Sequence, residues 1–295
     1  MELWATAKIN LFLSVLDRRP DGYHNIQTVY QSVGLADRLQ FEVLPAEIIL
    51  ECPDNDVPKG KGNLAVRAAD LMQRSYPDRV RGLRITLEKR IPMGSGLGGG
   101  SADAAATLRA CNALFELRLS ATELRALGSQ VGMDVPFLIE GGRAIGRDRG
   151  DRLESLAVRQ QLWAVVAVPP VAISTRWAYE QLDQRRSPDV PLLESFVDHL
   201  ENRPLNDWAP MCFNQFETVI FSSHLRARVL RDRLLQQGCQ GAFLSGSGAA
   251  VVGLTDDPER AARVAQEVNR WCRLAAAVPF LTGTDPDPQV GERLA

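Results

Sequence analysis

The sequence predicts an α+β protein built from two domains. With 295 residues, 45% of them hydrophobic, the chain is long enough for two ordinary cores. Alternating, strand-like segments and helix-forming segments occur in both halves. The second half reads strand, helices, strand, helix, strand, which is typical of a split βαβ sandwich. A strongly apolar strand begins at residue 161, so we predict one domain at residues 1–156 and a second at 157–295.

Composition excludes several classes of protein. The net charge of −2 gives no strong field for nucleic acid or anionic membrane. Five scattered cysteines without a CxxC pair and only three histidines argue against a structural zinc site and a disulfide framework. A reduced, cytoplasmic compartment is expected. The N-terminus has no signal-peptide pattern, and no run approaches ~18 apolar residues, so no membrane span is expected.

Residues 5–16 alternate as a strand. Lys8, Asn10, Phe12 and Ser14 are predicted on one face, with Ile9, Leu11, Leu13 and Val15 on the other. A lysine among apolar residues is usually a charge that snorkels at an edge. Together with Asn10, Lys8 could instead form a clamp for a phosphate or a hydroxyl group, and the spacing alone leaves both readings open.

A turn follows the first strand. Pro20-Asp21-Gly22 is turn chemistry and places Tyr23 and His24 just beyond it. An aromatic ring beside a histidine can stack on and hydrogen-bond a base. The same pair can also be an ordinary loop anchor.

Further along, residues 38–52 suggest a hairpin, Asn63 is expected to cap a helix, and residues 83–90 alternate as a half-exposed strand.

A glycine-rich stretch comes next and carries the strongest signal. Five of the seven positions from Gly94 to Gly100 are glycine, and an alanine-rich helix is predicted at about residues 101–115. Bare backbone N–H groups leading into a helix N-terminus form an anion-binding geometry, so we predict that a nucleotide phosphate binds here.

Other glycine motifs fit this stretch less well. Gly94-x-Gly96-x-x-Gly99 matches the dinucleotide fingerprint, but a half-exposed strand some ninety residues into the chain is the wrong context for it. A Walker A lysine and the protein-kinase signatures are absent from the sequence. A purely structural glycine turn is seldom this long.

Residues 120–131 form a predicted helix with a capping box, Ser120-x-x-Glu123. Asp134 then stands between a helix-stopping glycine and the apolar Val135-Pro136-Phe137. A carboxylate in that setting is either a turn cap or a functional group. A hairpin is predicted at 141–156.

The second half contains a strand at 161–168 and a short helix from Ser174 that carries Tyr179. A loop follows at 185–191, with helices near 193–200, 214–221 and 225–237. A second glycine cluster at 241–248 precedes a strand at 249–254, a helix that begins at Asp257-Pro258 and a closing strand at 274–281. The tail at 285–288 is predicted to be loose.

These motifs together resemble one enzyme family. Ala7-Lys8-Ile9-Asn10 with Pro20-Asp21-Gly22-Tyr23-His24, the stretch Pro92–Ser101, Gly132-Met133-Asp134-Val135-Pro136-Phe137 and Leu244-Ser245-Gly246-Ser247-Gly248 resemble, in order and spacing, the 4-diphosphocytidyl-2-C-methyl-D-erythritol kinases. The glycine stretch alone is similar to the wider GHMP kinase superfamily. Asn25 and Met133 depart from the commoner family pattern, but neither departure removes a functional group.

The resemblance implies a two-domain GHMP kinase fold, with an N-terminal domain like domain 2 of ribosomal protein S5 and a ferredoxin-like C-terminal domain. It implies ATP-dependent phosphorylation of the 2-hydroxyl of 4-diphosphocytidyl-2-C-methyl-D-erythritol, a step of the non-mevalonate isoprenoid pathway, with Mg²⁺ and a monomer or homodimer. By motif position, Lys8 and Asp134 would be the catalytic pair. The residues implied at the nucleotide are Asn63, Lys89, Pro92, Met93, Gly94, Ser95, Gly96, Leu97, Gly98, Gly99, Gly100, Ser101 and Ala102. Those implied at the substrate are Asn10, Tyr23, His24, Tyr179, Gly246 and Ser247.

In this chemistry Asp134 would accept the hydroxyl proton, and Lys8 would offset charge on the transferring group. No residue is predicted as a dedicated metal ligand. Asp103, in the first turns of the helix, favours the helix dipole but repels phosphate, so its role stays open.

Two other functions are consistent with parts of the pattern. One is another small-molecule kinase of the same superfamily, such as a homoserine or mevalonate kinase, although an amino-acid substrate should not need the aromatic residues Tyr23, His24 and Tyr179. A non-catalytic nucleotide-binding protein on this fold would need neither Lys8 nor Asp134.

Overall fold

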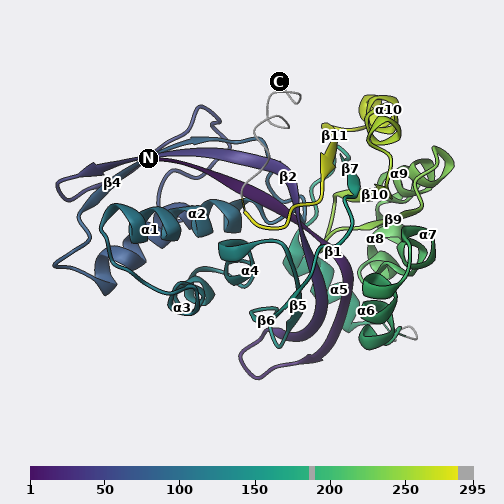
Figure 1. The fold of residues 1–295 in the computed structure, drawn as a ribbon, viewed down its shortest axis with the longest axis horizontal. Helices are drawn as coiled ribbons and strands as arrows, with labels where there is room; N and C mark the ends of the chain where they lie inside the picture. The colour runs from purple at the N-terminus through teal and green to yellow at the C-terminus, as the bar shows by residue number, and fades with distance from the viewer. Residues whose placement is uncertain (186–189, 285–295) are drawn as a thin grey trace.

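The computed structural model describes residues 1–185 and 190–284. The predicted loose tail and residues 186–189 of the predicted loop lie outside this part of the chain. Two sheets organise the fold, and the long strands β1 (Glu2–Arg18) and β2 (His24–Leu44) of the first sheet extend toward the second sheet (Figure 1). Within the described residues, no helix is long and apolar enough to cross a membrane.

The first sheet has seven strands, and its central path runs β3-β4-β2-β1-β8. A branch is formed by β5, which pairs with β2, and by β6, which pairs with β5. Its remaining strands are β3 (Ile48–Glu51), β4 (Gly82–Glu88), β5 (Arg143–Arg147), β6 (Arg152–Leu156) and β8 (Phe213–Asn214).

The hairpin predicted at residues 38–52 is wrong. Both segments are strands, but β4 lies between them, antiparallel to β2 and parallel to β3. Alternation identified the strands correctly. It carries no information about which strand pairs with which, and here the partner comes from beyond an intervening helix.

A second correction concerns the faces of β1. Leu11 has no partner across the strand pair, so the register shifts between Asn10 and Phe12. This bulge reverses the alternation. Phe12 therefore joins the same core cluster as Ile9, whereas Leu13 lines the cavity that Lys8 and Asn10 also line. Lys8 and Asn10 do share a face, as predicted.

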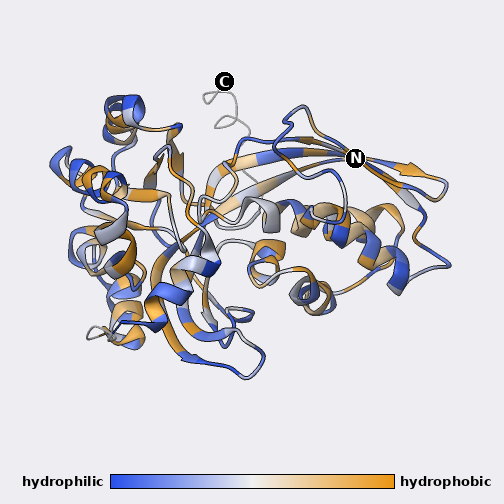
Figure 2. Cartoon of the chain, turned by 180° about the vertical axis from the view of Figure 1, so that it is seen from behind, coloured by the Kyte–Doolittle hydropathy of each residue, from blue (hydrophilic) through white to orange (hydrophobic). Residues whose placement is uncertain are grey.

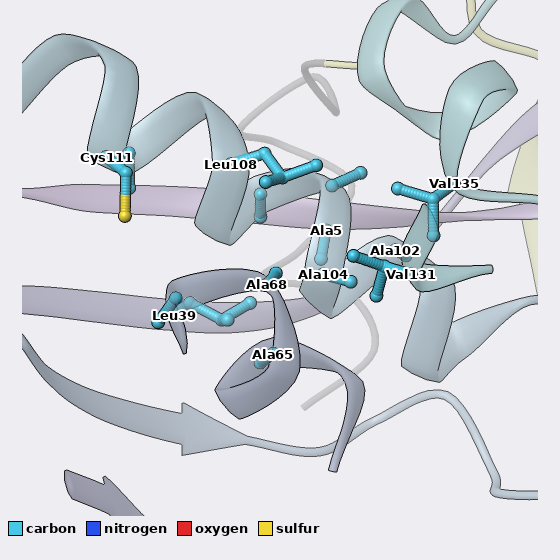
Figure 3. Packing of buried hydrophobic residues seen from close by; sticks show 14 of the residues in the cluster. Ala5, Leu39, Ala65, Ala68, Ala102, Ala104, Leu108, Cys111, Val131 and Val135 are labelled. Atoms are coloured by element: carbon cyan, nitrogen blue, oxygen red, sulfur yellow. The ribbon is translucent and has the colours of Figure 1, made fainter. Parts of the chain in front are cut away.

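Helices α1 (Leu64–Ser75), α2 (Gly99–Leu114) and α4 (Val135–Glu140) pack on the first sheet, and α3 (Ala121–Val131) packs on these helices. The predicted Asn63 cap of α1 and the Ser120–Glu123 capping box of α3 are both present. Helix α2 is buried along most of its length because its side chains are small. Figure 3 shows Ala104 of α2 near Ala68 of α1, within one hydrophobic core cluster. The first residues of α2, Gly99 to Ser101, line the cavity described below.

The second sheet has four antiparallel strands in the order β11-β7-β10-β9. This is the strand order of a ferredoxin-like domain. The strands are β7 (Trp163–Val168), β9 (Gly241–Leu244), β10 (Val251–Thr255) and β11 (Leu274–Pro279). Strand β9 was missed because the glycine cluster at 241–248 conceals its four residues. The predicted α+β class is confirmed.

Helices surround the second sheet: α5 (Thr175–Asp183), α6 (Leu193–Asn202), α7 (Leu205–Trp208), α8 (Glu217–Ser223), α9 (Leu225–Gln236) and α10 (Pro258–Val268), with 3₁₀ turns at Ala209–Met211 and Asn269–Trp271. In Figure 2 the turn between β1 and β2 is hydrophilic, whereas hydrophobic residues concentrate along the strands and on the helix faces that meet them.

The two sheets share one core. A single hydrophobic cluster joins Ile9 and Val29 of the first sheet to Val166 and Val252 of the second. Strand β8 also returns from the second half to pair with β1. The boundary between residues 156 and 157 stays a prediction. It falls between β6 of one sheet and β7 of the other, and the shared core means that the two halves pack as one body.

Candidate active site

One cavity of about 980 Å³ collects residues from both halves of the chain. It is lined by the glycine stretch, the N-terminus of α2, the start of α4, strands β1 and β2, helix α5 and the turn after β9. Most residues implied at the nucleotide and at the substrate line it. Leu97 and Ala102 are the exceptions, because both side chains are buried in the hydrophobic core.

The glycine stretch forms a tight loop that ends at the N-terminus of α2. Gly94, Gly96 and Gly98 have φ values of 62°, 81° and 74°, which L side chains rarely adopt. Gly98 is the N-cap of α2, so the first N–H groups of this helix face the loop. A Cβ on Gly98 would lie 3.1 Å from Cγ of Lys8. A side chain at this position would crowd that lysine.

Lys8 and Asp134 meet across this loop. The Lys8 ammonium lies 3.5 Å from Oδ2 of Asp134 and donates a 2.7 Å hydrogen bond to Oδ1 of Asn10. The Asp134 side chain is 31% exposed and lines the cavity, whereas the Lys8 side chain is only 5% exposed. Asp134 is the N-cap of α4, but its side chain makes no capping bond. The turn-cap reading of Asp134 is therefore wrong.

Tyr30 and Thr28 complete this cluster and were missed by the sequence reading. The Tyr30 hydroxyl donates to Oδ1 of Asp134 at 3.2 Å, and Asn10 donates to the Thr28 hydroxyl at 2.8 Å. Burial, together with the Asp134 charge, raises the pKa of Tyr30 well above its usual value, so this hydroxyl stays a donor. Their only sequence signal was their position on alternate residues of a strand.

Asp103, whose role the sequence leaves open, belongs to a buried ion cluster. Lys89 donates to Asp103 at 2.9 Å and also pairs with Asp37. The Asp37 carboxylate accepts from the backbone N–H groups of Arg90 and Ile91, which lead into the glycine loop. Burial lowers the pKa of Lys89, but the two carboxylates outweigh this and raise it. Asp103 therefore holds Lys89 near the loop.

An aromatic cluster forms the opposite end of the cavity. His24 stacks on Tyr179, with ring centroids 4.9 Å apart, and its Nε2 lies 2.8 Å from Oδ1 of Asp183. Phe216 meets Tyr179 edge-on. Tyr23 is 51% exposed and has the Arg149 guanidinium 5.8 Å from its ring centroid. The structure thus places the three residues implied at a base along one cavity, with the Tyr23 ring half exposed.

A turn from the second half supports the glycine loop from behind. The Ser245 hydroxyl donates to the carbonyl of Gly96 at 3.1 Å, and the Ala250 N–H donates to the carbonyl of Ser95 at 2.9 Å. Gly246 and Ser247, which are implied at the substrate, belong to this turn and line the cavity.

The carboxylate of Glu217 accepts a 2.8 Å hydrogen bond from the backbone N–H of Leu244, just before this turn. Burial raises the pKa of Glu217 to about 7, despite this hydrogen bond and the charge of Arg231. A raised folded-state pKa gives stability that is fully present below the unfolded pKa of about 4.5 and is lost as the pH rises through about 7.

Replacing Glu217 by Gln should therefore remove the loss of folding stability that this carboxyl causes as the pH rises. We expect the free energy of unfolding of Glu217→Gln, relative to the unchanged protein, to rise between pH 4.5 and 8 by up to about 3 kcal/mol. Thermal unfolding of both proteins across this range measures it, since all other titrating groups cancel in the difference. A difference that is flat with pH would show that Glu217 is not held in this way.

This fold and this site define a nucleotide-dependent kinase for small molecules. The family model described as GHMP kinases N terminal domain matches residues 63–142, and the one described as GHMP kinases C terminal matches residues 197–274. A solved mevalonate kinase superposes with a TM-score of 0.74 at 15% identity, over 97% of this chain and 100% of that one, which is a likeness of fold alone.

Nearer relatives narrow the class. The 4-diphosphocytidyl-2-C-methyl-D-erythritol kinases of Moorella thermoacetica and Enterococcus faecalis are 41% and 38% identical, each covering 91% of this chain and 94% of the relative. A solved 4-(cytidine 5'-diphospho)-2C-methyl-D-erythritol kinase superposes with a TM-score of 0.80 at 36% identity, over 95% of this chain and 99% of that one. The chain belongs to the 4-diphosphocytidyl-2-C-methyl-D-erythritol kinase family of GHMP kinases.

Proposed function

We propose that this kinase transfers the γ-phosphoryl group of ATP to the 2-hydroxyl of 4-diphosphocytidyl-2-C-methyl-D-erythritol. The observation that carries the proposal is the Lys8–Asp134 pair, which stands beside the glycine loop in one cavity whose other end is aromatic. The names of the nearer relatives supply the substrate. A homoserine or mevalonate substrate would leave that aromatic end without a purpose.

Asp134 is the proposed general base. Its carboxylate is exposed to the cavity, and one oxygen faces Lys8 while the other accepts from Tyr30. These two contacts hold the carboxylate in one orientation, and we propose that it accepts the substrate hydroxyl proton from there. The buried Lys8 ammonium offsets negative charge on the group being transferred, which is the main demand of phosphoryl transfer.

ATP is proposed to lie along the glycine loop, with its phosphates at the N-terminus of α2 and its adenine near Asn63 and Lys89. The left-handed glycines and the free first turn of α2 supply backbone donors for phosphate oxygens. Asn63 and Lys89 both line the cavity on this side.

Mg²⁺ is proposed as the metal cofactor. Within the described residues no cluster of three or more His, Cys, Asp or Glu could hold a metal ion by itself. That fits a Mg²⁺ bound through one carboxylate, waters and the nucleotide phosphates. When bound, Mg²⁺ would neutralise charge on the phosphates. The expected cytoplasmic location and the monomer or homodimer stay predictions.

Purified protein incubated with ATP, Mg²⁺ and a panel of alcohols tests the proposal. The panel should contain 4-diphosphocytidyl-2-C-methyl-D-erythritol, homoserine and mevalonate. We expect ADP release only with the cytidine compound. Faster turnover of homoserine or mevalonate would show that one of these alcohols is the substrate. ATP binding without any turnover would indicate a non-catalytic nucleotide-binding protein.

The proposed cytidine clamp makes a further prediction. Tyr23→Ala should weaken binding of the cytidine substrate by roughly 5- to 150-fold, because base stacking contributes ~1–3 kcal/mol per contact and each 1.4 kcal/mol is a factor of ten. Tyr23→Phe keeps the ring and is the matched control, expected to change affinity far less. Calorimetry with substrate and with ATP measures both, and ATP affinity should not change. Intact substrate affinity in Tyr23→Ala would remove the clamp from the proposal.

A further inference from the structure

A short connection, residues 213–217, contacts three parts of the active site at once. Strand β8 runs parallel to β1 next to Phe12 and Leu13, a few residues beyond Lys8. The Gln215 N–H donates to the carbonyl of Leu13 at 2.9 Å, and Phe216 packs against Tyr179 at the aromatic end. The third contact is made by Asn214.

Asn214 is buried and uses both ends of its amide on backbone groups. Its Nδ2 donates to the carbonyl of Leu244 at 2.7 Å and to the carbonyl of Gly246 at 2.8 Å, while its Oδ1 accepts from the N–H of Phe216 at 3.0 Å. The two carbonyls flank Ser245, the first residue of the turn after β9. The Asn214 side chain therefore ties the start of that turn to the connection.

The turn after β9 also lies against the backbone of the glycine loop. A Cβ added to Gly96 would lie 2.1 Å from the carbonyl oxygen of Ser245, and one added to Gly246 would lie 3.0 Å from the carbonyl oxygen of Gly96. With so little space between them, and with the Ser245 hydroxyl bonded to Gly96, a displaced turn must displace the loop.

We infer that Asn214 is a positioning residue for the nucleotide: it holds the turn at 245–248 in the shape that supports the phosphate side of the glycine loop. Asn214 does not line the cavity and touches no ligand in this scheme. The inference rests on the proposed function only in that the glycine loop binds ATP.

Asn214→Asp is the variant that isolates this role. It keeps the side-chain shape and the oxygen that accepts from Phe216, but it replaces the donor with a carboxylate facing two carbonyl oxygens. We expect the affinity for a non-hydrolysable ATP analogue with Mg²⁺ to fall at least roughly tenfold, since two buried hydrogen bonds are lost. The KM for ATP should rise accordingly.

Asn112→Asp is the matched control. The Asn112 amide also bridges two backbone groups, accepting from the N–H and donating to the carbonyl of Leu119, at the end of α2 far from the cavity. A merely structural role for Asn214 would make the two variants alike: both would lower the unfolding temperature and neither would change ATP affinity. That result would overturn the inference.

Ser245→Ala keeps the test decisive if Asn214→Asp does not fold. It removes one hydrogen bond between the turn and the loop and leaves Asn214 in place. We expect roughly threefold weaker binding of the ATP analogue, and unchanged binding would contradict the inference. Because the analogue is titrated without any acceptor alcohol, both results are independent of which substrate the enzyme phosphorylates.

Discussion

Replacing Asp134 by Asn is expected to lower turnover by ~10²-fold or more, because a general base contributes ~10²–10⁴-fold and an amide cannot accept the hydroxyl proton at neutral pH. Asn keeps the shape of the side chain and can still accept from Tyr30. Initial rates at saturating ATP and substrate measure the loss. Substrate affinity should change much less than turnover.

The structure offers a matched control for this variant. Asp257 is also at a helix N-cap, that of α10, where its carboxylate accepts from two backbone N–H groups. Asn caps helices as well as Asp does, so Asp257→Asn should leave turnover unchanged. Near-normal turnover in Asp134→Asn would return Asp134 to a structural role and leave the cavity without its proposed base.

Replacing Gly98 by Val is expected to abolish ATP binding while leaving the far-UV spectrum nearly native. The residue has a φ of 74°, which a β-branched side chain tolerates poorly, and its Cβ would press on Lys8 at 3.1 Å. The variant therefore disturbs both the phosphate cradle and the catalytic lysine. Calorimetric titration with ATP measures the effect.

Gly238→Val is the control that distinguishes damage to the ATP site from the effect of backbone strain alone. Gly238 follows α9 with a φ of 93°, and its nearest neighbour would be Cδ of Arg260 at 3.8 Å. It carries the same backbone penalty away from the cavity, so we expect lower stability and unchanged ATP affinity. Unchanged ATP affinity in a folded Gly98→Val protein would place the nucleotide elsewhere.

The sequence predicted what depends on local pattern. Alternation along β1 placed Lys8 and Asn10 on one face, and their side chains are 2.7 Å apart. The glycines predicted a loop that leads into a helix. The structure has that loop, with left-handed backbone at its glycines, directly before α2. The residues alone left Asp134 as either a turn cap or a functional group, and the resemblance favoured the functional role.

The missed features depend on contacts between distant parts of the chain. Tyr30 reaches Asp134 over 104 positions, and Asn214 reaches Leu244 and Gly246 over 30 and 32 positions. The hydrophobic periodicity of a sequence does not reveal contacts between residues so far apart. The bulge at Leu11 was missed for a related reason, since it exists only in the register with the neighbouring strand. Asp37 had a weak signal, a lone carboxylate in an apolar strand.

The position of the transferred phosphate tests the central claim most directly. In the named substrate, carbon 2 carries a methyl group and therefore no hydrogen. A proton-coupled phosphorus-31 spectrum of the reaction with ATP and Mg²⁺ should show ADP and one new monoester resonance without three-bond coupling to hydrogen. A new resonance split by hydrogen would place the phosphate on another hydroxyl. Inorganic phosphate alone would mean that no transfer to the substrate takes place, and either result would contradict the account.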